Sequence, residues 1–201
     1  PLLPVFLNSR LGPGPYMPAS RLFWNDFYLD VSRVPELAFC PEARKLMDSS
    51  DFQESLSALR TSPLVDYHRQ AALKRKVLEL LLDCLLTGKS GRLAGFRSYI
   101  RSHPALEDYA GFRAAGEKHG IDWRRWPQKM RGGKLDSGDF ADNDRQYHLY
   151  AQWLAQEQIS DISQKARQDR FYLYLDLPVG VHPLSYDVWR ERESFVAGVN
   201  G

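Results

Sequence analysis

The feature that most constrains the fold is a long stretch, from about residue 36 to residue 170, in which apolar residues recur at helical spacing. Its clearest helix is predicted to open at Thr61-Ser62-Pro63, where a capping residue precedes a proline suited to a first turn, and to end at Gly88. Three more helices are predicted, through Phe96 to Ile100, from Pro104 toward Gly120, and from Tyr147 to Ile162. This stretch predicts a large helical region.

The segments that flank the helical stretch have a different pattern. Residues 1–35 contain a Pro/Gly-rich loop from Leu11 to Pro18 and a predicted short strand from Phe27 to Val31. Residues 171–177 are apolar or aromatic on both alternating faces, which is typical of a strand covered on both sides in a parallel sheet. The expected organisation is therefore an α/β chain with three parts, 1–35, 36–170 and 171–201.

Charge and cysteine content exclude several classes of protein. The chain has 27 basic and 25 acidic residues, so no bulk attraction to nucleic acid or anionic lipid is expected. No run approaches the roughly 18 apolar residues that a membrane span needs. Cys40 and Cys84 stand far apart with no CxxC, and the five histidines show no ligand spacing. We expect a chain from a reducing compartment without metal or cofactor.

Two carboxylates near the second strand are the best chemical candidates. Asp176 stands at the carboxyl end of the predicted strand, where parallel sheets bind ligands, and Asp187 follows beside Tyr186 and Trp189. Carboxylates beside aromatic rings suit sugars, which offer hydroxyls at their edges and C–H surfaces on their faces. The structural alternative is that Asp176 caps the following loop.

Two further segments each allow two interpretations. The aromatic loop, which we define as residues 16–28, fits either a local hydrophobic plug or a ligand platform. The basic stretch from Arg124 to Lys134 could contact phosphates, but a solvated face whose tryptophans, Trp123 and Trp126, point inward is favoured. A helical nucleic-acid-binding domain is therefore a rival interpretation, and the near-zero net charge counts against it.

Three segments in order along the chain carry a resemblance to a known family. They are Gly14-Pro15-Tyr16-Met17-Pro18-Ala19-Ser20-Arg21-Leu22-Phe23-Trp24-Asn25, Leu64-Val65-Asp66-Tyr67 with Lys74 downstream, and Leu173-Tyr174-Leu175-Asp176-Leu177-Pro178-Val179-Gly180-Val181 with Asp187-Val188-Trp189. Together they resemble the 4-α-glucanotransferases (amylomaltase or disproportionating enzyme) of glycoside hydrolase family 77. Trp123 with Trp126-Pro127, and Tyr147-His148 with Gln152-Trp153-Leu154, fit the helical region of the same family.

The resemblance implies an α-amylase-type (β/α)8 TIM barrel with a large helical insertion among its early strands. A barrel takes about 250 residues, so this chain of 201 residues is expected to be an incomplete barrel. The implied activity is transfer of α-1,4-glucan segments between maltooligosaccharides by a retaining double displacement, in the cytoplasm and without a cofactor.

The resemblance also assigns residues. It implies that Tyr16, Ser20, Asn25, Asp176, Asp187 and Trp189 bind substrate. Gly14 stands where serine is usual and Trp24 where many relatives have glycine. The family's Arg-x-Asp-His-like nucleophile motif and Glu-Asp-Leu-Gly-like acid/base motif are absent, and Glu107-Asp108-Tyr109 is not the latter. No catalytic residue is therefore assigned, and the chain alone is predicted to be inactive.

Two alternatives stay open at this stage. One is a carbohydrate-binding or helical interaction module without catalysis, and the other is a hydrolase instead of a transferase. The sequence leaves the oligomeric state undetermined. Exposed edges of a partial barrel predict poor solubility for the chain alone.

Overall fold

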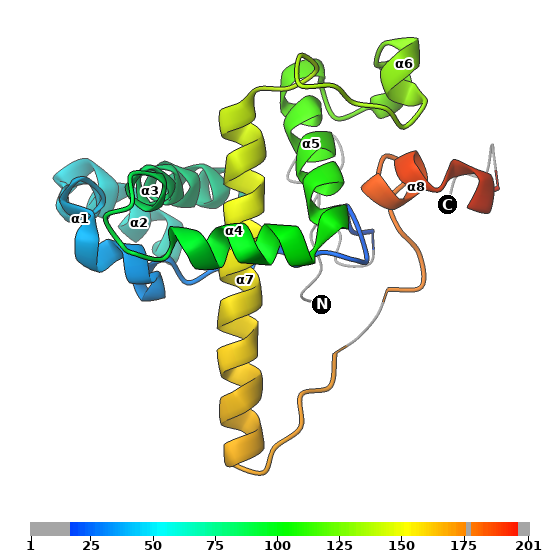
Figure 1. Cartoon of the computed structure of the whole chain (residues 1–201). Helices are drawn as coiled ribbons and strands as arrows, with labels where there is room; N and C mark the ends of the chain where they lie inside the picture. The colour runs from blue at the N-terminus through cyan, green and yellow to red at the C-terminus, as the bar shows by residue number, and fades with distance from the viewer. Residues whose placement is uncertain (1–16, 176–177, 197–201) are drawn as a thin grey trace.

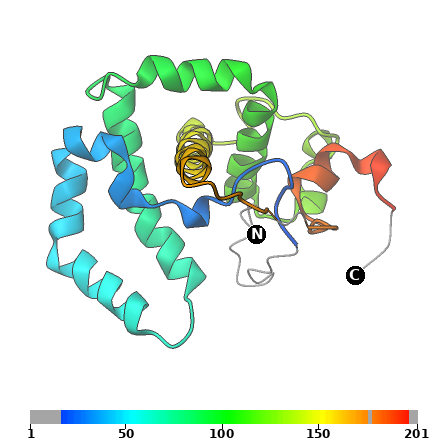
Figure 2. The same ribbon diagram turned by 90° about the horizontal axis from the view of Figure 1, so that it is seen from below.

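The computed structural model describes residues 17–175 and 178–196. One long helix, α7 (Asp142–Gln168), runs through the centre, and the other helices surround its first half (Figures 1 and 2). These are α1 (Pro41–Asp48), α2 (Ser50–Thr61), α3 (Tyr67–Leu86), α4 (Leu93–Ser102), α5 (Pro104–His119), α6 (Gln128–Arg131) and α8 (Tyr186–Arg190). Short 3-10 helices are η1 (Asp26–Tyr28), η2 (Val31–Arg33), η3 (Pro35–Phe39), η4 (Trp123–Arg125) and η5 (Arg192–Ser194).

The sequence predicts three of the helices well and misplaces the start of a fourth. α4, α5 and α7 are confirmed, and α5 has Pro104 in its first turn and ends before Gly120, whose φ is 87°. The predicted start at Thr61-Ser62-Pro63 is wrong because α3 begins only at Tyr67. There the Asp66 carboxylate accepts a hydrogen bond from the backbone N–H of Arg69 at 3.0 Å and caps the helix.

The core lies where α3, α4 and α5 pack on the first half of α7. Residues 147–155 of α7 are all buried. Trp153 packs between the rings of Phe96 and Tyr150, with centroid distances of 5.4 and 6.2 Å. The helical stretch predicted from the sequence is thus a helical body that buries its own apolar faces.

The strand predicted from Phe27 to Val31 is wrong. η1 and η2 occupy this segment, and residues 17–175 and 178–196 contain no β-strand at all. The physical reason is local capping: the side chain of Asn25 accepts from the N–H of Phe27, and that of Asp30 accepts from the N–H of Ser32, both at 3.0 Å. These N–H groups are then unavailable to a sheet.

The described part of the second predicted strand, residues 171–175, is not a strand either. It leaves the end of α7 as an extended segment (Figure 1), with Tyr172 95% and Tyr174 97% exposed. A strand exists only when its N–H and C=O groups pair with a neighbouring strand. The expected early barrel strands are therefore not confirmed, and Asp176, Leu177 and the apolar run from Leu2 to Leu7 lie outside the described residues.

Candidate functional site

A buried hydrogen bond joins the aromatic loop to the segment that begins α8. The hydroxyl of Ser20 donates to Oδ1 of Asp187 at 2.5 Å, and the backbone N–H of Arg21 donates to Oδ2 at 3.0 Å. Ser20 is fully buried and Asp187 is 7% exposed. Two of the predicted sugar-binding residues thus lie together, and both carboxylate oxygens of Asp187 accept hydrogen bonds from the loop.

Backbone contacts hold the same two segments side by side. The N–H of Tyr186 donates to the carbonyl of Ala19 at 2.8 Å, and the N–H of His182 donates to the carbonyl of Pro18 at 3.2 Å. Ser185 caps α8 by accepting from the N–H of Val188. Residues far apart in sequence therefore form one junction, which we call the Ser20–Asp187 clamp.

Trp189 follows Asp187 by two residues and packs in the core. It is completely buried, its indole N–H donates to the carbonyl of Met130 at 2.8 Å, and its ring lies 5.1 Å from that of Phe112. In the described structure Trp189 presents no ring face to a ligand, because core side chains cover it. Its predicted contact with a sugar remains a prediction.

Asn25 lies at the other end of the loop, where its side chain caps η1. Beside it, Gln152 of α7 holds the backbone of Trp24 twice: Oε1 accepts from its N–H at 2.9 Å, and Nε2 donates to its carbonyl at 2.8 Å. Sequence reasoning did not assign this role to Gln152. The available signal was a polar amide within the apolar run of residues 147–155, where a buried amide needs partners.

The remaining predicted residues are Tyr16 and Asp176, which lie outside the described residues. Within the described part of the aromatic loop, Phe23 stacks on Tyr109 with centroids 4.0 Å apart and planes at 17°. It also meets the edge of Tyr186 at 5.7 Å. Phe23 thus packs as the plug interpretation of the loop expects.

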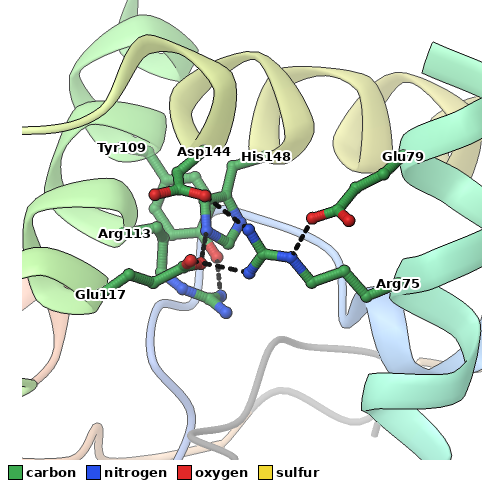
Figure 3. A network of polar contacts seen from close by, with 7 residues as sticks. All are labelled: Arg75, Glu79, Tyr109, Arg113, Glu117, Asp144 and His148. Carbon is green, nitrogen blue, oxygen red and sulfur yellow. Dashed lines mark hydrogen bonds and ion pairs between the residues drawn. The ribbon is translucent and has the colours of Figure 1, made fainter. Parts of the chain in front are cut away.

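A second polar cluster, which sequence reasoning missed, lies between α3, α5 and α7 (Figure 3). Arg75 donates to Glu79 at 2.6 Å, to Glu117 at 2.7 Å and to Asp144 at 2.6 Å. His148, which is 3% exposed, contacts the Glu117 carboxylate at 2.7 Å. Three carboxylates from three helices therefore meet around one guanidinium.

Burial and charge shift the pKa values in this cluster. Burial and the nearby charge of Arg113 lower the pKa of His148 below its ordinary 6.5, so its ring is neutral at pH 7. Burial alone would raise the pKa of Glu117, but the hydrogen bond with His148 and the charge of Arg75 lower it to about 2. Burial and Glu117 raise the pKa of Asp144.

The basic stretch has the geometry of a solvated face. Trp123 and Trp126 are 9% and 2% exposed, whereas the Arg124 side chain is largely in solvent and pairs with Asp122 at 2.8 Å.

In the part of the chain that the structure describes, no three His, Cys, Asp or Glu side chains gather as metal ligands. None of the described helices has the length and hydropathy required to cross a bilayer.

Comparison with known proteins relates this geometry to one family. The family model of 4-alpha-glucanotransferase matches residues 1–201. The 4-alpha-glucanotransferase of Mycobacterium tuberculosis is 31% identical over 204 residues, which cover 98% of this chain and 28% of the relative. That of Haemophilus influenzae is 27% identical and covers 90% of this chain and 29% of the relative. The chain thus spans less than a third of these two relatives.

Solved structures agree in fold. An amylomaltase from Streptococcus agalactiae in complex with acarbose superposes with a TM-score of 0.75 at 20% identity, covering 96% of this chain and 38% of that one. The amylomaltase from Corynebacterium glutamicum gives a TM-score of 0.70 at 25% identity, covering 98% and 26%. With the family model matched along its whole length, the chain belongs to the 4-α-glucanotransferases of glycoside hydrolase family 77.

Proposed function

We propose that this chain is part of a 4-α-glucanotransferase that moves α-1,4-glucan segments between maltooligosaccharides in the cytoplasm. The observation that carries the proposal is a family match along all 201 residues of a chain that spans only 28% of its mycobacterial relative. In the family a carboxylate nucleophile forms a glycosyl-enzyme intermediate, and a second carboxyl group protonates the leaving oxygen and then activates the acceptor. We place both groups outside this chain.

In this proposal the chain shapes one side of the sugar site. The Ser20–Asp187 clamp fixes the aromatic loop at one end and Gln152 fixes it at Trp24. Because a sugar acceptor must outcompete water, a loop held at both ends favours transfer over hydrolysis. Tyr16, Ser20, Asn25, Asp176, Asp187 and Trp189 are proposed as the substrate-binding set, with Ser20 and Asp187 acting chiefly by positioning the loop.

The test is an assay of the intact enzyme that contains this chain, with maltotriose as the only substrate. The proposal expects glucose together with longer maltodextrins. Glucose and maltose without longer products would instead indicate a hydrolase, and no turnover would favour a carbohydrate-binding module. Residues 1–201 alone are expected to show no disproportionation, and measurable transfer by them would contradict the placement of the catalytic carboxylates.

A matched pair of variants tests the clamp. Asp187→Asn keeps the shape of the side chain but removes the charged acceptor of the Ser20 and Arg21 hydrogen bonds. It is expected to lower the ratio of transfer to hydrolysis in the intact enzyme. Asp169→Asn, at an exposed position just after α7, is the control and should leave that ratio unchanged.

A further inference from the structure

A partly open cavity of about 400 Å³ lies beside the polar cluster and is lined mainly by residues of η1, α3, α5 and α7. Its volume falls in the range of pockets that bind small molecules. Accessible apolar surface comes from Phe27, Ala71 and Ile121, and charged groups come from Asp26, Lys74 and Arg113. The cavity therefore combines apolar surface with cationic and anionic groups.

Arg113 is the charged group that the protein itself leaves least satisfied. Its guanidinium carries five N–H donors. It makes one side-chain hydrogen bond, from Nη1 to the Tyr109 hydroxyl at 2.7 Å (Figure 3). Among the described residues no carboxylate lies within 4.0 Å of it. A largely buried guanidinium always stays charged, so it offers a strong site for an anion.

The other ionic groups of the cavity differ in how far they are already engaged. Arg75 is saturated by three carboxylates, and Lys74 donates to the carbonyls of Phe27 and Leu29 at 2.5 and 2.9 Å. Asp26, by contrast, receives no side-chain hydrogen bond from any residue in the described ranges. The charge of Asp26 acts on Lys74 and Arg113, but the hydrogen-bonding capacity of the Asp26 carboxylate and of the Arg113 guanidinium is largely unused.

We propose that this cavity binds a monoanionic sugar acid, with its carboxylate on Arg113 and a hydroxyl donating to Asp26. A planar carboxylate matches the fork of a guanidinium. A dianion is disfavoured because Asp26 and Glu117 also line the cavity. This site is separate from the Ser20–Asp187 clamp and does not depend on glucanotransferase activity.

Three probes with closely related rings and different charge test the proposal by calorimetry on the intact enzyme that contains this chain. They are D-glucuronate, D-glucose and D-glucosamine. Glucuronate is expected to bind about tenfold more tightly than glucose, the effect of a charge-assisted hydrogen-bond pair, and glucosamine most weakly. Equal binding of all three, tightest binding of glucosamine, or binding of none would overturn the proposal. Tighter binding of glucose 6-phosphate than of glucuronate would also overturn it.

Substitutions identify the residue that is responsible for the preference for glucuronate over glucose. Arg113→Met is expected to abolish the preference for glucuronate over glucose, whereas Arg97→Met, at an exposed position of α4, should retain it. Asp26→Asn should preserve that preference, and its loss there would contradict the assignment to Arg113. Should Arg113→Met lose its helical circular dichroism, NMR of the unaltered intact enzyme decides: glucuronate must shift the Nε–H signal of Arg113, and an unmoved signal overturns the proposal.

Discussion

The two halves of α7 differ in how far the rest of the protein buries them. Residues 147–155 are buried between α3, α4 and α5, whereas the second half projects beyond them and leads into residues 171–175 (Figure 1). Yet residues 171–175 are as apolar as the buried half: Phe171 is 70% exposed and Leu175 50%. Apolar pattern alone therefore does not determine burial, because a partner surface must also be present.

The difference in burial between α7 and residues 171–175 has a physical explanation. A helix satisfies its own backbone and needs only neighbouring side chains, which α3, α4 and α5 supply within this chain. A strand needs another strand for its backbone as well, and none is present in residues 17–175 and 178–196. In the barrel that the family resemblance implies, neighbouring strands would cover residues 171–175.

The largest expected effect comes from breaking the ionic group at the boundary between the two halves. Glu36 is fully buried and holds Nη1 of Arg92 at 2.9 and 3.0 Å, while Arg92 also pairs with Glu157 of α7. Arg92→Met would leave a buried carboxylate without its cation. We expect a loss of about 3–5 kcal/mol in the free energy of unfolding, measured by urea denaturation.

Two variants control this experiment. Arg124→Met removes an exposed partner of Asp122 and should cost about 0.5 kcal/mol or less. Adding Glu36→Gln to Arg92→Met removes the stranded charge and should recover part of the loss. A double variant no more stable than Arg92→Met would show that packing against Trp153, rather than charge, dominates.

The next largest effect on stability is expected at the Ser20–Asp187 clamp, which joins the aromatic loop to α8. Asp187→Ala removes the acceptor of two hydrogen bonds, one of them at 2.5 Å. A cost of about 2 kcal/mol is expected, together with faster amide hydrogen exchange at Arg21 and Leu22. Unchanged exchange there would mean that the backbone contacts of Ala19 and Tyr186 suffice to hold the loop.

Part of this arrangement was predictable from the sequence. Apolar spacing located α4, α5 and α7, and the resemblance singled out Ser20 and Asp187, which lie in contact. The start of α3 was missed because Pro63 and Asp66 both look like helix starts three residues apart, and only Asp66 caps. The Arg75 cluster was missed because its charges come from three helices, and spacing along one chain segment does not reveal which helices pack together.

Acid should lower the stability of the fold through His148, which lies in the buried half of α7. The pKa of His148 is lowered in the folded state, so between that value and 6.5 the unfolded chain binds more protons and stability falls with falling pH. The melting temperature should therefore drop between pH 7 and pH 5, above the range in which Glu117 titrates. His148→Gln should flatten this dependence, and an equal drop in the variant would assign the dependence to other groups.

The smallest effect on stability is expected from a substitution in residues 171–175. It tests most directly the contrast between this exposed segment and the buried half of α7. Leu173 is 45% exposed, so Leu173→Ser should change the stability of the 201-residue chain by about 0.5 kcal/mol or less and raise its solubility. Leu154→Ser, in the buried half, supplies the contrasting control. In the intact enzyme Leu173→Ser should become strongly destabilising, because neighbouring strands would bury this position. If it stays neutral there, residues 171–175 are not a covered strand of the barrel.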